Sequence, residues 1–279
     1  MADPKVGKSW LWLLAMVLAY VGVLFATRAA RSLSLMEWRI VAMDGHRAGA
    51  QPLTLDNVNE ALDKYEGTAL EPEAEIIRDA QPQLAPLKVV LGHSDAMYMN
   101  LRTDPDLPLG NLFVDALRAY GERYFKHPMD FAITNFGGIR VPLPEGPVTM
   151  EDVSSMFPFK NYMCYVKMKG SALQALLEQL AGTKAFQPVS GVRVKVKNHK
   201  LESALVGGEP IDPDRIYHVI TIDFLLDGGD KINIGALAQE VKLSKVLLKD
   251  VMMDYVTGCE ARGEIITAKA DGRVIMEED

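Results

Sequence analysis

A short apolar run that ends in a pair of glycines is the feature that most constrains the fold of this chain. Residues 129–134, Met-Asp-Phe-Ala-Ile-Thr, have the length and the apolar content of a buried β-strand. The six residues that follow are Asn135, Phe136, Gly137, Gly138, Ile139 and Arg140. Because glycine lets a ligand approach the main chain closely, this stretch predicts an open loop at the carboxyl edge of a sheet. Asn135 can donate and accept hydrogen bonds, and Arg140 offers a planar fork suited to phosphate or carboxylate. An ordinary turn is the alternative interpretation of the two glycines.

A second strand leads into a similar loop. Residues 217–222, Tyr-His-Val-Ile-Thr-Ile, predict a buried strand, and the Gly-Gly loop after it carries Phe224 and Asp230. Phe159 follows a proline elsewhere in the chain. If the rings of Phe159 and Phe224 face one another, they form a slot for a flat heterocycle, and stacking contributes about 1–3 kcal/mol per base. Asp230 can accept hydrogen bonds from ribose hydroxyls. The residues alone favour two core phenylalanines beside two turns, and a nucleoside or nucleotide site is the alternative interpretation.

The charge of the chain argues against one class of ligand. The formal net charge is -7; residues 1–31 hold four basic residues and one acidic residue, a net +3, so the remainder carries -10. A body this acidic does not fit a binder of nucleic acid polymers, which needs a basic face. The two cysteines, Cys164 and Cys259, have no metal-binding spacing. Cys164 is most simply a small buried hydrophobic residue, and a single long-range disulfide is the alternative.

The N-terminus predicts export. Residues 10–26 are uncharged and apolar, and Lys5 and Lys8 precede them, which is the layout of a signal peptide or signal anchor. We therefore expect a signal segment at residues 1–31, with membrane anchoring by residues 10–26 as one possibility. We expect an N-terminal extension with linker helices at 32–86 and the main domain at 87–279. The protein is then periplasmic or extracellular.

Asp44 and His46 follow a predicted strand at 37–43, as the first ligands of a metallophosphoesterase do. That chemistry needs several further carboxylate, asparagine and histidine ligands to hold two metal ions. The sequence contains no Gly-Asp block and no Gly-Asn-His-Glu block downstream of them. We therefore predict no metal site in this chain, and a degenerate site at Asp44 and His46 is the alternative.

Hydrophobic periodicity and turn residues predict the remaining elements. These are a strand at 88–92, a helix from an N-cap at Asn111 to Tyr124, a short helix at 151–156, a half-buried strand at 161–169, a helix from a Ser171–Gln174 capping box to Leu180, strands at 192–196 and 201–205 around a turn at 198–200, a last helix through Leu243, Leu247, Val251 and Tyr255, and a closing strand at 272–276.

Five ordered blocks resemble the C-terminal, substrate-binding domain of the 5′-nucleotidase family, over roughly residues 85–278. They are Leu-Gly-Asn-Leu at 109–112, the Asn-Phe-Gly-Gly-Ile-Arg loop at 135–140, Ser-Met-Phe-Pro-Phe at 155–159, Val-Ser-Gly-Val-Arg at 189–193 and Asp-Phe-Leu-Leu-Asp-Gly-Gly-Asp at 223–230. The resemblance implies an α/β (α+β) fold of layered mixed β-sheets flanked by helices.

The resemblance also implies roles for single residues. In this family two aromatic rings clamp the base, which corresponds to Phe159 and Phe224 here. An asparagine and arginines hold nucleoside and phosphate, which corresponds to Asn135, Arg140 and, less directly, Arg102, with Gly137 and Gly138 in the binding loop. The aspartate that holds the ribose corresponds to Asp230. In the family a separate N-terminal dimetal domain carries out hydrolysis.

Three positions depart from the family pattern. Asp104 stands where the family has an arginine, Lys231 follows the Gly-Gly-Asp motif in place of a glycine, and Phe136 replaces a small residue. We expect an exported nucleotide-recognition subunit for a nucleoside monophosphate that needs a separately encoded metallophosphoesterase chain, with its divalent metals, for hydrolysis. On its own it is not expected to hydrolyse nucleotides. The alternative is a non-catalytic module that binds nucleosides or nucleotide-sugars.

Overall fold

The computed structural model describes residues 58–101, 105–183 and 186–278. The chain divides into two compact units, Met1–Pro82 and Gln83–Asp279. Residues 10–26, the strand expected at 37–43, Asp44, His46 and Arg102 lie outside the described residues. In the first unit the description begins with α2, Val58–Asp63, and continues into α3, Glu71–Leu84, which runs into the second unit.

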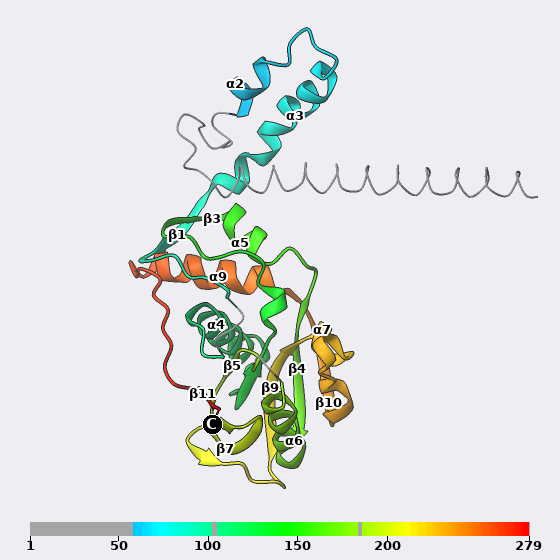
Figure 1. Cartoon of the computed structure of the whole chain (residues 1–279), viewed down its shortest axis with the longest axis vertical. Coiled ribbons are helices and arrows are strands. Elements are labelled where there is room, and N and C mark those ends of the chain that lie inside the picture. The colour runs from blue at the N-terminus through cyan, green and yellow to red at the C-terminus, as the bar shows by residue number, and fades with distance from the viewer. Residues whose placement is uncertain (1–57, 102–104, 184–185, 279) are drawn as a thin grey trace, which may run out of the picture. The chain divides into compact units, whose positions relative to one another are not determined.

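The second unit contains the remaining elements, which Figure 1 shows as mixed helices and strands. The helices are α4 (Pro108–Phe125), α5 (Met150–Met156), α6 (Gly170–Ala181), α7 (Asp223–Leu226), α8 (Ile234–Leu237) and α9 (Leu248–Ala261), with 3-10 turns at Ala85–Lys88, Phe136–Gly138 and Gly229–Lys231. The strands are β1 (Val90–Ser94), β2 (Phe131–Ile133), β3 (Gly146–Thr149), β4 (Tyr162–Lys169), β5 (Val189–Ser190), β6 (Val192–Lys197), β7 (Lys200–Val206), β8 (Glu209–Pro210), β9 (Ile216–Ile222), β10 (Glu240–Leu247) and β11 (Val274–Glu277).

These strands form three sheets, which confirms the predicted class of layered mixed sheets flanked by helices. The central sheet has the order β10-β4-β9-β2-β5; β9 and β2 run parallel, and every other neighbouring pair is antiparallel. The second sheet, β11-β6-β7-β8, is also mixed, and β1 pairs with β3 in a small third sheet. Gly191 connects β5 to β6 with φ +80°, and a Cβ there would lie 2.2 Å from the Asp130 carbonyl oxygen, so only glycine fits at this passage between sheets.

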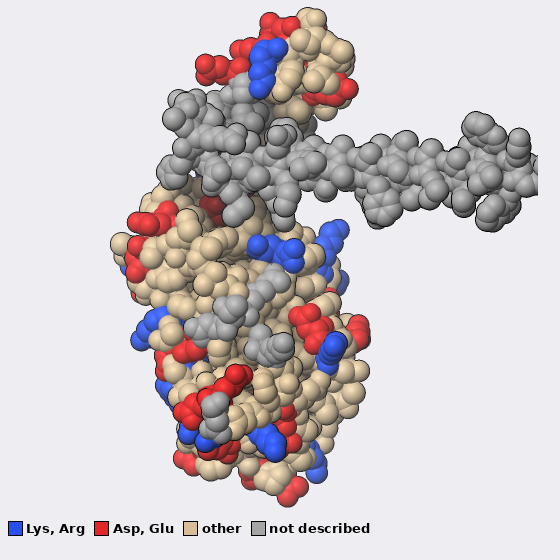
Figure 2. Space-filling model, in the orientation of Figure 1, with Lys and Arg blue, Asp and Glu red and all other residues tan. Residues whose placement is uncertain are grey.

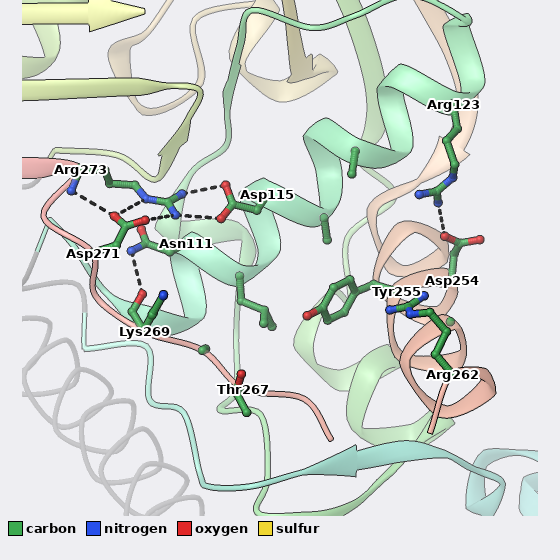
Figure 3. A pocket seen from close by; sticks show the side chains of 15 residues that line it. Asn111, Asp115, Arg123, Asp254, Tyr255, Arg262, Thr267, Lys269, Asp271 and Arg273 are labelled. Atoms are coloured by element: carbon green, nitrogen blue, oxygen red, sulfur yellow. Dashed lines mark hydrogen bonds and ion pairs between the residues drawn. The ribbon is translucent and has the colours of Figure 1, made fainter. Parts of the chain in front are cut away.

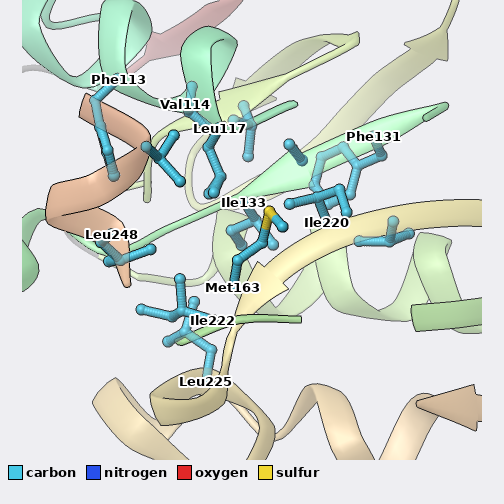
Figure 4. Packing of buried hydrophobic residues seen from close by; sticks show 14 of the residues in the cluster. Phe113, Val114, Leu117, Phe131, Ile133, Met163, Ile220, Ile222, Leu225 and Leu248 are labelled. Carbon is cyan, nitrogen blue, oxygen red and sulfur yellow. The ribbon is translucent and has the colours of Figure 1, made fainter. Parts of the chain in front are cut away.

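The hydrophobic core lies on both faces of the central sheet. Helix α4 covers one face, where Gly121 packs against Ile220 and Phe125 packs against Tyr165. Helices α6 and α7 contact β4 and β9, and Figure 1 shows α7 and α4 on opposite sides of these strands. Figure 4 shows the interdigitation of this core between helix and sheet. Because both faces are covered, β4 is buried along most of its length rather than half-buried as its alternation predicted.

Three predicted helix details are wrong, because other local signals or tertiary contacts replace the predicted one. Asn111 is not an N-cap: α4 begins at Pro108, a residue suited to the first helical turn, and Asn111 lies inside it, buried and bonded to Asp106. Ser171 and Gln174 form no capping box, since the Gly170 and Ser171 N–H groups already donate to the Arg215 and Pro213 carbonyls. Leu243 and Leu247 belong to strand β10, which pairs with β4, and the last helix starts only at Leu248.

The other predicted elements agree with the structure. β1, α5, β6, β7, the turn between these two strands, and β11 lie within a few residues of their expected positions. Cys164 and Cys259 are both buried free thiols, so the disulfide alternative does not apply. No helix among the described residues is long and apolar enough to cross a membrane.

Candidate nucleotide-binding site

The predicted site residues come from neighbouring strand ends. β2 ends two residues before Asn135, and β9, its parallel neighbour, ends two residues before Phe224. β4 runs antiparallel to β9 with Met163 opposite Ile222, so the start of β4, just after Phe159, meets the carboxyl end of β9. Three adjacent strands of the central sheet thus bring Asn135, Phe159 and Phe224 to the same edge.

A hydrogen bond joins the two Gly-Gly loops. The Asn135 side-chain amide donates from Nδ2 to Oδ2 of Asp230 over 2.7 Å. Asn135 is buried, whereas Asp230 is exposed and adopts a left-handed conformation with φ +50°. The other amide atom, Oδ1 of Asn135, is buried and has no hydrogen-bond partner among the described residues. A buried acceptor without a donor costs about 1–3 kcal/mol, so this oxygen is a place where a donor would bind favourably.

Gly137 and Gly138 wrap around the Asn135 amide. A Cβ on Gly137 would lie 3.0 Å from Nδ2 of Asn135, and a Cβ on Gly138 would lie 2.9 Å from Oδ1. A side chain at either position would crowd the amide, which would have to shift. The close approach of this backbone to the Asn135 side chain therefore favours glycine at both positions.

Arg140 and Phe159 form a pair beside this loop. The guanidinium carbon of Arg140 lies 5.5 Å from the centroid of the Phe159 ring, within the range of a cation–π contact. Arg140 is exposed, and its backbone N–H donates to the Met156 carbonyl over 2.9 Å. Phe159 is 46% exposed, so it is not a core phenylalanine.

Phe224 is 41% exposed and lies beside the Asp230 loop. A Cβ on Gly229 would fall 2.5 Å from the ring carbons of Phe224, so the ring packs directly on the residue before Asp230. Among the aromatic pairs of the described residues, none joins Phe224 to Phe159, so the two rings do not touch. Phe159 contacts Arg140, which belongs to the same loop as Asn135. Phe224 packs on Gly229, the residue before the Asp230 that accepts from Asn135.

Two supporting residues were not predicted from the sequence. Asn100 donates to the carbonyl oxygens of Phe136 and Ile139, and Gln187 accepts from the Phe136 backbone N–H over 2.9 Å. Neither lies within a motif block, so only long-range contacts could reveal them. Phe136, the departure from a small residue, is buried; it packs near Gly110, where a Cβ would lie 3.0 Å from its ring.

A cavity of about 740 Å³ lies away from these residues, between α4, α9 and residues 267–273 (Figure 3). Its arginines already have partners: Arg123 pairs with Asp254, Arg262 with Glu264, and Arg273 with Asp115 and Asp271. A second cavity of about 440 Å³ lies on the other side of the Arg273 pairs. Neither of these two cavities is lined by Asn135, Arg140, Phe159, Phe224 or Asp230.

The described residues contain no group of three or more His, Cys, Asp or Glu side chains placed to hold a metal ion. On the face in view in Figure 2, acidic and basic side chains of the described residues are interspersed rather than gathered into a basic stripe.

Comparison with known proteins agrees with the motif blocks. The model of the 5′-nucleotidase C-terminal domain matches residues 90–237, more than half of the chain. Cell wall protein Lmo0130 of Listeria monocytogenes is 30% identical over 190 residues, 62% of this chain and 24% of that protein. Protein UshA of Yersinia enterocolitica is 28% identical over 151 residues, 49% of this chain and 27% of that protein.

The fold comparison gives the same answer. The crystal structure of a 5′-nucleotidase precursor from Thermus thermophilus superimposes with a TM-score of 0.64 at 25% identity, over 74% of this chain and 42% of that one. The matched part of this chain spans about a quarter of the two curated relatives. The region matched by the family model contains Asn135, Arg140, Phe159, Phe224 and Asp230. This chain belongs to the 5′-nucleotidase C-terminal domain family.

Proposed function

We propose that the chain is the nucleotide-recognition module of a 5′-nucleotidase-type phosphohydrolase and that it binds a nucleoside monophosphate at the Asn135–Asp230 edge of the central sheet. The base stacks between Phe159 and Phe224, the ribose hydroxyls donate to Asp230, and Arg140 pairs with the phosphate. One observation carries the proposal: the hydrogen bond from Asn135 to Asp230 joins two Gly-Gly loops, each of which lies beside an exposed phenylalanine.

The chemistry of the cluster supports this assignment. Both phenylalanine rings are exposed and available to a base, and stacking on an aromatic ring contributes about 1–3 kcal/mol per base. The partnerless Oδ1 of Asn135 can accept a hydrogen bond from a ligand hydroxyl or N–H. Arg140 combines a planar fork with contact to the Phe159 ring, so a ligand that reaches both can carry a base and an anionic group.

The proposal assigns hydrolysis to a separately encoded dimetal phosphoesterase chain. Phosphate ester hydrolysis in such enzymes uses two metal ions to stabilise the attacking and leaving oxygens. Asp104 stands at the place of a family arginine, which leaves Arg140 and Arg102 as the arginines for phosphate. The proposal includes the division into residues 1–31, 32–86 and 87–279 and export through residues 10–26. The name of the relative from Listeria, a cell wall protein, supports export. Fusing residues 1–50 to alkaline phosphatase, which is active only after export, tests this part.

Calorimetric titration of the full chain with AMP, then with adenosine, tests the binding proposal. We expect affinity in the micromolar to millimolar range, and a loss of about tenfold or more for Phe224→Ala, because one stacking surface disappears. Tyr124→Ala is the matched control, since Tyr124 is similarly exposed (47%) but belongs to α4. Equal binding by Phe224→Ala and the unmodified chain would exclude the aromatic clamp.

Two further arms separate the alternatives. Equal affinity for adenosine and AMP would favour a nucleoside-binding module without a catalytic partner, since Arg140 would then contribute nothing to phosphate. Rapid phosphate release from AMP by the purified chain with added Mn²⁺ or Zn²⁺ would contradict the need for a partner chain. It would favour the alternative of a metal site at Asp44 and His46.

A further inference from the structure

The segment 97–101 contacts the first Gly-Gly loop and has two distinct sides. Met97, Met99 and Leu101 are 57%, 44% and 59% exposed, whereas Tyr98 and Asn100 between them are partly buried. This alternation is that of an extended chain whose successive side chains point to opposite sides. One side of the segment therefore faces the protein through Tyr98 and Asn100.

Tyr98 anchors this segment to the body of the domain. Its backbone N–H and carbonyl pair with Leu143 at 3.0 and 3.1 Å. Its hydroxyl donates to Asp95 and accepts from the Ala268 backbone N–H at 2.9 Å. Four hydrogen bonds therefore hold the residue two positions before Asn100, so Asn100 is presented from a constrained backbone.

Asn100 in turn holds the Gly-Gly loop. Its amide nitrogen Nδ2 donates to the Phe136 carbonyl over 3.0 Å and to the Ile139 carbonyl over 2.6 Å. These two carbonyls lie on either side of Gly137 and Gly138. Both N–H groups of one amide are used, one for each end of the turn, so a side chain without an NH2 group cannot reproduce the arrangement.

We propose that Asn100 is a positioning residue for nucleotide binding: it sets the loop that presents Asn135 at one end and Arg140 at the other. The inference rests on the proposed function, because it assigns Asn100 a role at the same site. Gln187 supports the loop from another side by accepting the Phe136 N–H. The two hydrogen bonds of the Asn100 side chain go to the Phe136 and Ile139 carbonyls, so Asn100 acts through the backbone of residues 136–139 rather than by binding the nucleotide.

Replacing Asn100 with aspartate tests this role with little change of volume. Asn100→Asp places a carboxylate against two carbonyl oxygens, so both hydrogen bonds are lost and the three oxygens repel. We expect AMP affinity at pH 7.5 to fall about tenfold or more relative to the unmodified chain. Lowering the pH should restore part of the AMP affinity, because a protonated carboxyl can again donate one hydrogen bond. The measure is the ratio of the variant's AMP affinity to that of the unmodified chain at each pH. A general loss of stability would not recover in this way.

Asn233→Asp is the matched control. Asn233 uses its side-chain oxygen to accept from the Ala236 N–H, and aspartate keeps that oxygen, so AMP affinity should not change at any pH. If Asn100→Asp does not fold, Asn100→Ala removes both hydrogen bonds without adding charge, and the same loss of affinity is expected. Binding like that of the unmodified chain in either Asn100 variant would overturn the proposal.

Hydrogen exchange separates this inference from the proposed function. The Gly138 and Ile139 amides donate within the turn, to the carbonyls of Asn135 and Phe136. In Asn100→Ala these amides should exchange several-fold faster, while amides in β9 keep their rates. If the unmodified chain binds neither AMP nor adenosine, the proposed function fails, but faster exchange would still establish that Asn100 positions the loop. Unchanged exchange would refute the positioning role whatever the ligand.

Discussion

At the residue scale, the contact between Phe224 and Gly229 connects the proposed stacking surface to the loop proposed to bind ribose. A Cβ on Gly229 would lie 2.4 Å from the Phe224 carbonyl oxygen and 2.5 Å from its ring, far inside van der Waals distance. Gly229→Ala should therefore displace the ring and the backbone beside Asp230. We expect AMP affinity, measured by calorimetry, to fall about five- to tenfold, because a shift of this loop would move both the Phe224 ring and Asp230 away from the ligand.

The control for this substitution is Gly182→Ala, at the end of α6. Gly182 has a helical φ of -72°, and a Cβ there would lie 3.5 Å from its nearest neighbour, an ordinary contact. Gly229 also lacks a positive φ, so its replacement acts through the contact with Phe224 rather than through backbone strain. Affinity unchanged in Gly229→Ala would show that the Phe224 ring does not contribute to binding in its present position.

At the element scale, most of the longer strands were predictable from the sequence, whereas strand β10 and the caps of two helices were not. β4 and β9 show as largely apolar runs because the core covers most of their length, and β6 shows as an alternating run because only one of its faces is buried. The N-terminal capping of α6 does not come from neighbouring residues in the sequence, because the first N–H groups of the helix donate to carbonyls in the turn at 213–215. The motif blocks named Asn135 and Asp230, but the bond between them crosses 95 positions and appears only in the folded chain.

Arg273 joins three elements and offers a prediction at this scale. It immediately precedes β11, forms two bonds of 2.8 Å with the Asp115 carboxylate on α4, and donates to the Val189 carbonyl on β5. Burial alone would lower the pKa of Arg273, but its bonds to Asp271 and Asp115 outweigh burial and raise the pKa above the usual value. The guanidinium therefore stays charged, and its removal leaves two carboxylates unpaired.

We expect Arg273→Met to lower the free energy of unfolding by about 2–3 kcal/mol in urea titration. The figure is below the usual cost of breaking a buried ion pair, because Asp115 is 47% exposed and water can solvate it. Arg262→Met is the comparison: its side chain is 56% exposed in its pair with Glu264, so this variant should lose much less stability than Arg273→Met. Equal losses for the two variants would mean that Arg273 does not connect the two sheets energetically.

At the scale of the whole molecule, folding stability should depend on one buried thiol. Cys164 lies in β4 at the centre of the core and is fully buried. Burial, followed by the nearby charges of Asp223 and Asp227, raises the pKa of Cys164 from 9.0 to about 12. Between these two values the unfolded chain releases the thiol proton and the folded chain keeps it. The thiol therefore costs no stability below pH 9, and the free energy of unfolding falls as pH rises from about 9 to 12.

The slope of this fall is about 1.4 kcal/mol per pH unit, so the thiol should lower stability by about 2 kcal/mol between pH 9 and pH 10.5. Cys164→Ala removes the thiol, so its free energy of unfolding should fall by about 2 kcal/mol less over this pH range. Urea unfolding of both chains, followed by circular dichroism, measures this difference. Tyrosines titrate in both chains and cancel in the difference. The variant should be less stable at pH 7.5 because a buried sulfur is lost, and the two curves should run parallel below pH 8. Parallel curves up to pH 10.5 would contradict this prediction. They would mean that the folded chain tolerates the charged thiolate, because water reaches it or because the structure around β4 changes.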